Sequence, residues 1–208
     1  MNDKYNCECG SNENLFILYD FGLIPQVNNY RHIDEKGDIK KYPLVLAICN
    51  SCKLLQLTEM PDRENIFRNY DHYSSASANN TEHLHSIAEI INNRHDSEKI
   101  ILEVGCNDGT LLKSLDSKHS IYGVDPASNV YDKNINDKFT ILHEFFDIEN
   151  IEKIKSMIEK PVDIILGINV FAHNDSYMSM FAAIESLLAD DGYAHVEVAY
   201  AADTVLSA

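Results

Sequence analysis

The residues with the clearest chemical potential follow a short apolar run near the middle of the chain. Residues 100–104 predict a buried strand, Gly105 ends it, and Gly109 opens an apolar-periodic segment typical of a helix. Glycine at these positions lets backbone N–H groups and the positive end of a helix approach a ligand closely. The carboxylates of Glu103 and Asp108 suit a ligand with cationic groups better than they suit a pyrophosphate.

A further carboxylate follows the next predicted strand. Residues 120–126 predict a strand that ends at Asp125, 22 residues beyond Glu103. At the end of a neighbouring parallel strand, such a carboxylate can accept hydrogen bonds from both hydroxyls of a ribose. We therefore predict that Asp125 binds a ribose, the alternative being a helix cap.

The pattern E-x-G-x-x-x-G resembles the first motif of the class I S-adenosylmethionine-dependent methyltransferases, whose cofactor carries amino and sulfonium groups. The alternative is a glycine-rich turn that only packs. The resemblance implies that this loop and later strand ends contact the cofactor, through Glu103, Gly105, Cys106, Asn107, Asp108, Gly109, Asp125, Pro126, Phe145, Phe146 and Asn169. Phe145 or Phe146 could stack on the adenine; that both are core aromatics is an equal alternative.

Four of the five cysteines form two close pairs within the first 52 residues: Cys7 and Cys9, then Cys49 and Cys52. In a chain without a signal peptide, such clustering indicates a metal more than disulfides. Four thiolates suit a tetrahedral zinc ion held as in a zinc ribbon. Because the first pair is C-x-C rather than C-x-x-C, His32 or His72 could replace one ligand, and two reduced pairs without metal are the alternative.

These residues need a framework, and apolar periodicity predicts one. Two strands, 42–48 and 54–57, form a hairpin whose turn carries the second cysteine pair. Further strands are predicted at 100–104, 120–126, 139–143, 162–168 and 193–198, the last preceded by a turn at 190–192. Helices are predicted at 80–93, from Gly109, at 151–158 and at 177–188, the first with a capping box of Asn79 and Glu82.

The alternation of strands and helices predicts an α/β protein with a doubly wound sheet. The resemblance implies that this is a Rossmann-like class I methyltransferase sheet, preceded by a small zinc-ribbon-like module. We expect the zinc-binding module over residues 1–65 and a helical connector with a tyrosine motif over 66–97. The domain that binds S-adenosylmethionine is expected over 98–208, incomplete at its C-terminus.

Composition restricts the partners. The 208 residues include 17 basic and 33 acidic side chains, a net charge of −16. This balance argues against nucleic acid or an anionic membrane as the main partner, because both reward clustered Lys and Arg. No apolar run approaches the roughly 18 residues that span a bilayer. We expect a cytoplasmic protein.

A more specific resemblance lies in the N-terminal third. The order is a cysteine pair, Phe-Gly-x-x-Pro from Phe21, Tyr-Pro-Leu from Tyr42, C-x-x-C, Leu-x-Gln-Leu from Leu54, and Phe-Arg-Asn-Tyr-Asp-His-Tyr-Ser-Ser from Phe67. It is similar to the sugar C-methyltransferases, zinc-containing enzymes that methylate a carbon of a nucleotide-linked keto-deoxysugar. The resemblance covers essentially the whole chain and implies zinc and S-adenosylmethionine as cofactors and a nucleotide sugar as substrate.

The same resemblance implies that Tyr73 and His173 line the catalytic site, the alternatives being a packing aromatic and a capping or solvent histidine. The family carries a His/Tyr cluster and a large domain after the last strand predicted here. We therefore expect a truncated chain, or one whose remainder is a separate C-terminal-domain polypeptide. Two other functions stay open: an O- or N-methyltransferase acting on a sugar or small molecule, and a non-catalytic module that binds S-adenosylmethionine and zinc.

Overall fold

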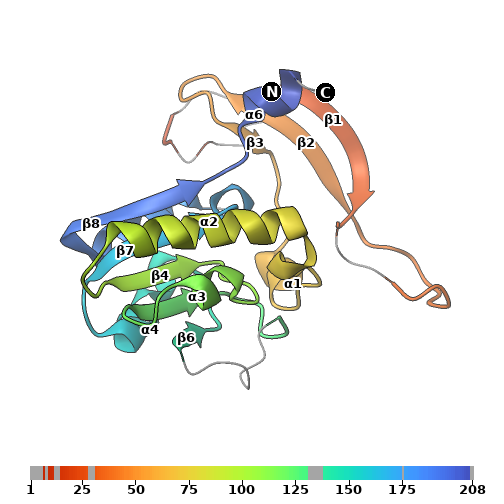
Figure 1. Cartoon of the computed structure of the whole chain (residues 1–208). Helices are drawn as coiled ribbons and strands as arrows, with labels where there is room; N and C mark the ends of the chain where they lie inside the picture. The colour runs from red at the N-terminus through yellow and green to blue at the C-terminus, as the bar shows by residue number, and fades with distance from the viewer. Residues whose placement is uncertain are drawn as a thin grey trace. The chain divides into compact units, whose positions relative to one another are not determined.

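The computed structural model describes residues 7, 9–11, 15–27, 31–130, 138–174 and 176–206. The chain divides into two compact units, one of Met1–Ile66 with Ala201–Ala208 and the other of Phe67–Tyr200. Figure 1 shows the elements of both units. The expected three-part division stays a prediction.

The N-terminal unit is built on an antiparallel sheet with the strand order β1-β2-β3. Its strands are β1 (Leu15–Pro25), β2 (Lys41–Cys49) and β3 (Leu55–Leu57). The predicted hairpin is confirmed, because Leu46 pairs with Leu57 and Ile48 with Leu55. The sequence did not predict β1, whose apolar residues follow one another without alternation and are mostly exposed. The short helix α6 (Ala201–Leu206) belongs to the same unit.

The second unit contains a parallel sheet with the strand order β6-β5-β4-β7-β8. Its strands are β4 (Ile100–Val104), β5 (Ser120–Val124), β6 (Phe139–Leu142), β7 (Val162–Ile168) and β8 (Leu188–Glu197). The chain leaves β4 toward β5 and β6, then returns to β7 on the other side of β4. This order confirms the doubly wound sheet, and it makes the carboxyl edge near β4 the place where a ligand would bind.

Helices cover both faces of this sheet. The helices α2 (Ala78–Arg94) and α3 (Thr110–Ser114) pack against one face, where Ile101 and Ile164 point. The helices α4 (Ile151–Ile158) and α5 (Tyr177–Leu187) pack against the other, where Leu102 and Ile165 point. Neighbouring residues of a strand point to opposite faces, so continuous apolar strands fill both layers. Shorter elements are α1 (Arg63–Phe67), η1 (Ser74–Ala76), η2 (Ile148–Asn150) and η3 (Phe171–His173).

Two local predictions are wrong. The N-cap of α2 is Ser77, whose hydroxyl accepts from the Asn80 N–H at 3.4 Å, so Asn79 lies inside the first turn and forms no capping box. Residues 190–192 form no turn before the last strand but a bulge within β8, since Leu188 pairs with Val162 and Tyr193 with Ile164. Asp190 and Asp191 stay exposed there, so their carboxylates remain in water although the strand continues.

Among the described residues, none of the helices combines the length and the apolar character needed to cross a lipid bilayer.

Gly123 of β5 is required by a close approach between strand and loop. A methyl group at this position would lie 2.6 Å from Cys106 Sγ and 2.9 Å from Leu112 Cδ1. We expect Gly123→Ala to lower the free energy of unfolding by about 1–3 kcal/mol through overpacking. Adding Cys106→Ala should restore part of this loss, because it removes the sulfur. Urea unfolding of both single variants and the double variant measures the coupling; strict additivity would contradict this assignment.

Candidate functional site

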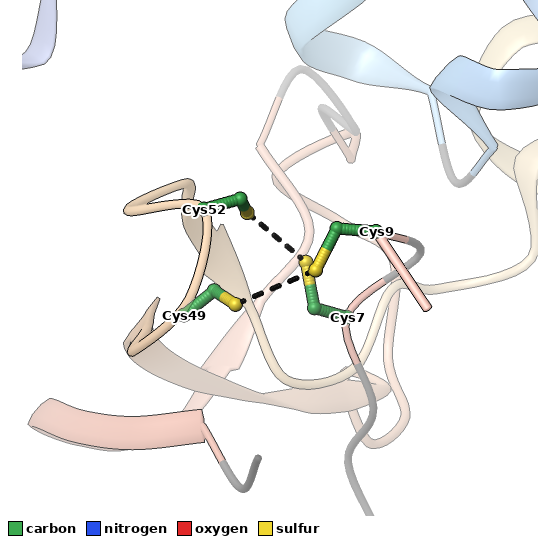
Figure 2. A group of neighbouring side chains, drawn as sticks. All are labelled: Cys7, Cys9, Cys49 and Cys52. Atoms are coloured by element: carbon green, nitrogen blue, oxygen red, sulfur yellow. Dashed lines mark hydrogen bonds between the residues drawn. The ribbon is translucent and has the colours of Figure 1, made fainter. Parts of the chain in front are cut away.

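The four N-terminal cysteines converge in one place. The sulfur atoms of Cys7, Cys9, Cys49 and Cys52 all lie within 4.8 Å of one another. Cys7 Sγ lies 3.6 Å from Cys52 Sγ, and Cys9 Sγ lies 3.7 Å from Cys49 Sγ, as the dashed lines in Figure 2 mark. Zinc–sulfur bonds of about 2.3 Å in a tetrahedron place the sulfurs about 3.8 Å apart. The cluster therefore fits a zinc ion, which these four thiolates would hold.

Two turns bring the pairs together. The Gly10 N–H donates to the Cys7 carbonyl at 3.2 Å, which folds the shortened first pair back on itself. Cys49 ends β2, and its N–H donates to the Leu54 carbonyl across the hairpin turn that carries Cys52. The C-x-C spacing thus does not prevent four sulfurs from meeting. Neither His32 nor His72 belongs to this cluster, which is the one group of three or more possible ligands found among the described residues.

The thiols of this cluster differ in acidity. Burial raises the pKa of Cys7 to about 12. A hydrogen bond from the backbone of Cys52 lowers the pKa of Cys49 to about 6. A metal ion requires thiolates, so binding to this cluster would release protons, including the one that Cys7 holds when no metal is bound.

At the carboxyl edge of the parallel sheet, Glu103 and Asp125 come from adjacent strands. Glu103 lies in β4 opposite Gly123 of β5, and Asp125 directly follows β5. Glu103 is 4% exposed, and its Oε2 atom has no hydrogen-bond partner among the residues that the structure describes. Burial, followed by the charges of Asp125 and Asp108, holds the pKa of Glu103 well above its usual range. A buried carboxylate oxygen without a donor suits a cationic ligand group.

Asp125 connects two loops and keeps acceptor capacity. Its Oδ2 accepts from the Asn107 N–H and its Oδ1 from the Ala127 N–H, both at 2.8 Å. Burial raises the pKa of Asp125, although these two hydrogen bonds oppose the shift. A carboxylate has about four lone-pair sites, so each oxygen can accept one more hydrogen bond. Pro126 follows directly, and the Ala127 contact forms a local turn.

The loop after β4 depends on Gly105. Its φ is +67°, and a Cβ there would lie 2.2 Å from Val170 Cγ2, so a side chain is excluded on both counts. Gly109 closes the loop before α3, with its N–H donating to the Cys106 carbonyl at 2.8 Å. Cys106 is 2% exposed and packs in the core with Leu112. Its thiol is therefore part of the packed core beneath the loop, and its carbonyl accepts the hydrogen bond that closes the loop.

Asn107 and Asp108 bind a segment from earlier in the chain. The Asn107 amide donates to the His72 carbonyl and accepts from the Ser74 N–H, both at 2.9 Å. Asp108 Oδ2 accepts from the Ser75 N–H at 3.1 Å. Burial acts to raise the pKa of Asp108, but hydrogen bonds, the largest from Ser75, hold it below its usual value. These two side chains thus hold residues 72–75 against the loop.

The same segment contacts the next two loops. Tyr70 and Asn129 exchange two hydrogen bonds, from the Tyr70 N–H at 3.0 Å and to the Tyr70 carbonyl at 2.9 Å. Arg68 donates from Nη1 to the His143 carbonyl at 3.1 Å and from Nη2 to Glu144 Oε2 at 3.2 Å. Asn129 follows β5, whereas His143 and Glu144 follow β6.

We call residues 67–75 the edge strap. Besides the contacts above, the Arg68 guanidinium carbon lies 4.8 Å from the centre of the Phe145 ring, and the Phe67 and His173 rings are 6.5 Å apart. The edge strap therefore touches the loops after β6, β5, β4 and β7. It lies across the carboxyl ends of these parallel strands.

The remaining predicted residues lie around this edge. Tyr73 is 41% exposed, at a point where both its neighbours are fixed by Asn107. His173 ends η3 after β7, and Asn169 follows β7 with its N–H donating to the Glu197 carbonyl at 2.9 Å. Phe146 lies in the apolar core with α4 and α5. Phe145 lies beneath Arg68, also buried.

Arg68 and Asn129 were not singled out from the sequence. Both lie in stretches without apolar periodicity, and each forms hydrogen bonds with a residue at least 59 positions away in the chain. The run of aromatic and polar residues before α2 weakly indicated a functional segment. It did not indicate which strand ends this segment would contact.

The cysteine cluster predicts that the purified protein contains a single zinc ion per chain. Cys9→Ser should weaken zinc binding by at least about tenfold, because a hydroxyl is a poor zinc ligand. Cys106→Ala is the control, since this thiol lies in the core of the other unit. Metal analysis by mass spectrometry and competition with a chelator measure both effects. Unchanged zinc affinity in Cys9→Ser would contradict the four-sulfur site.

The buried Glu103 predicts a pH-dependent stability. Folding raises its pKa, so the wild-type protein loses stability as the pH rises from about 4.3 through the pKa of the folded state. Glu103→Gln should therefore raise the free energy of unfolding at pH about 8 by about 1–3 kcal/mol, and by less at pH about 5. Urea unfolding at both values measures the difference. Glu89→Gln, at an exposed position of α2, is the control, and a gain independent of pH would contradict the assignment.

Comparisons with known proteins agree with this geometry. Residues 7–67 match a family model described as "Putative zinc binding domain". C-methyltransferase NovU of Streptomyces niveus is 25% identical over 197 residues, which are 92% of this chain and 46% of NovU. The chain thus spans about half the length of the curated relative it matches. A similar solved structure is that of the plantazolicin methyltransferase BpumL in complex with a pentazolic desmethylPZN analog and SAH. The match covers 64% of this chain and 52% of the BpumL chain, with a TM-score of 0.50 and 13% sequence identity. It shows a shared fold.

Residues 70–206, more than half of the chain, match a family model described as "Methyltransferase domain". This range contains the whole parallel sheet and its carboxyl edge with Glu103 and Asp125. The chain therefore belongs to this family of methyltransferase domains.

Proposed function

We propose that this protein is an S-adenosylmethionine-dependent methyltransferase that transfers the methyl group to a carbon of a nucleotide-linked keto-deoxysugar. One observation carries the cofactor: Glu103 and Asp125 lie at the carboxyl ends of adjacent parallel strands, one with an unpartnered buried oxygen among the described residues and the other with spare lone pairs. Such a pair suits a molecule with a cationic end and a ribose.

The chain's own groups divide the binding between them. Glu103 Oε2 would accept a hydrogen bond from the amino group of the cofactor, and Asp125 would accept from the ribose hydroxyls. The loop fixed by Gly105 lets the backbone approach without a side chain in the way. When bound, S-adenosylmethionine supplies an electrophilic methyl group on its sulfonium sulfur.

Carbon as the acceptor is supported by the match to a C-methyltransferase and by the edge strap. Methylation of a carbon next to a ketone needs a proton removed and an enolate stabilised by donors. The Tyr73 hydroxyl can donate such a hydrogen bond, and the His173 imidazole can hold the sugar or relay a proton. The keto-deoxysugar rests on the resemblance of the N-terminal residue pattern to the sugar C-methyltransferases.

Zinc would have a structural part in this proposal. Its four sulfur ligands leave no open position for a substrate. Among the described residues of Met1–Ile66, the buried apolar side chains are Cys7, Ala47 and Cys49, too few for a core of ordinary size. Metal binding would supply folding energy that this unit lacks.

Calorimetry tests the cofactor site directly. We expect the wild-type chain to bind S-adenosylmethionine and S-adenosylhomocysteine, and Asp125→Asn to weaken both by at least about tenfold, because an amide cannot accept from two hydroxyls as a carboxylate can. Glu103→Gln should also weaken binding of S-adenosylmethionine while stabilising the free protein. Asp116→Asn is the control, since Asp116 pairs with Lys118 at the surface.

The absence of any binding heat at millimolar cofactor would overturn the proposal and favour a non-catalytic module. If the cofactor binds, the acceptor is tested by mixing the protein with a nucleotide-linked keto-deoxysugar and methyl-labelled cofactor. Nuclear magnetic resonance of the product shows whether the new methyl group is on carbon. A methyl group on oxygen or nitrogen would favour the alternative methyltransferase.

A further inference from the structure

The edge strap makes its most extensive side-chain contacts at the loop after β6. There the Arg68 guanidinium donates to the His143 carbonyl and the Glu144 carboxylate, and it lies over the face of the buried Phe145 ring. One side chain thus contacts three consecutive residues. A planar guanidinium is suited to this combination, because it offers several fixed donors and a flat face at once.

This loop lies where the far end of the proposed cofactor would reach. With its cationic end at Glu103 on β4 and its ribose at Asp125 after β5, a ligand extends toward β6, one strand spacing of about 4.8 Å further. The next group after the ribose is the adenine base. It would therefore meet residues 143–145.

The loop also contains a ring nitrogen without a hydrogen-bond partner among the described residues. The Nδ1 atom of His143 is buried and has no hydrogen-bond partner within the part of the chain that the structure describes. The same histidine is close enough to Asp125 for its charge to lower the pKa of that carboxyl. A base bound beside Asp125 would find an unpaired ring nitrogen and a buried aromatic ring, both in the loop that Arg68 holds.

We infer that Arg68 is a positioning residue for the adenine end of the cofactor, acting through the His143–Phe145 loop. The inference rests on the proposed function, since it needs S-adenosylmethionine at this edge. Arg68 fixes the backbone of His143 and the plane of the Phe145 ring before the ligand arrives. Preorganisation of this kind strengthens binding because the loop does not have to be ordered by the ligand.

The Glu144 carboxylate offers a matched control. Lys153 Nζ also donates to Glu144, at 2.6 Å, and it lies on α4 away from the edge strap. The hydrogen bond from Lys153, followed by that from Arg68, holds the pKa of Glu144 below its usual value. Removing Lys153 takes one cation from Glu144 and leaves the contacts of Arg68 with His143 and Phe145 intact.

The test measures binding of S-adenosylhomocysteine and of 5′-methylthioadenosine, which keeps the adenine and ribose but lacks the amino acid end. We expect Arg68→Ala to weaken both ligands by the same factor, about tenfold, and Lys153→Ala to change either by less than about twofold. Arg68→Lys should recover part of the loss, because an ammonium reaches Glu144 but cannot stack or donate in a fork. In turnover, the loss should appear in KM for the cofactor and not in kcat.

Hydrogen exchange gives a readout without any ligand. The amides of residues 143–147 should exchange faster in Arg68→Ala than in the wild type, with Lys153→Ala unchanged. Wild-type binding with an Arg68→Ala affinity within about twofold would overturn the inference and leave the proposed function standing. If Lys153→Ala weakened ligand binding as much as Arg68→Ala does, the inference would be overturned too, because the loss of affinity would then come from the Glu144 carboxylate. A wild-type chain that binds neither ligand would instead overturn the proposed function, and this inference with it.

Discussion

The parallel pairing of β4 with β5 is the constraint on which the site depends. Glu103 lies opposite Gly123, so the two strands end side by side and their following loops meet at one edge. In a parallel sheet all carboxyl ends point the same way, and this is why groups 22 residues apart can share a ligand. Gly123 has a second part in this arrangement, because it leaves room for Cys106 beneath the loop.

A site of this kind costs stability. Glu103 is buried beside two other carboxylates, and within the described residues one of its oxygens has no donor. An apolar side chain of similar size would suit the free protein better. Asp108 has a different environment, since Ser75 and Thr110 donate to it and Lys113 adds a favourable charge. Two acids five residues apart thus differ in environment, because donors within the protein satisfy Asp108, whereas Glu103 keeps one oxygen without a donor among the described residues.

The edge strap, residues 67–75, brings residues outside the sheet to the carboxyl edge where Glu103 and Asp125 lie. Asn107, Asn129 and Arg68 connect it to three successive loops, largely through backbone groups. Backbone contacts fix the path of the strap whatever its side chains are. Tyr73 is then presented at the edge by a segment that is held on both sides, and it keeps an exposed ring. The N-terminal unit is separate and has a small sheet with few buried side chains, and its four thiols converge at the spacing that a zinc ion requires.

The sequence by itself determined the strands of the parallel sheet, its main helices, the cysteine hairpin and the main candidate residues. Apolar periodicity and strand-end acids are local patterns, so the parallel strands, the cysteine hairpin and the positions of Glu103 and Asp125 could be predicted from neighbouring residues. The tertiary structure alone decided which way side chains face and whom they meet. In the structure, Cys106 and Phe146 lie in the core, and Asn107 and Asp108 bind the edge strap. Ser77 caps α2, and Arg68 lies over Phe145. Apart from the Ser77 cap, each of these outcomes depends on a partner that is distant in the sequence, and patterns among neighbouring residues do not reveal which distant residues will meet.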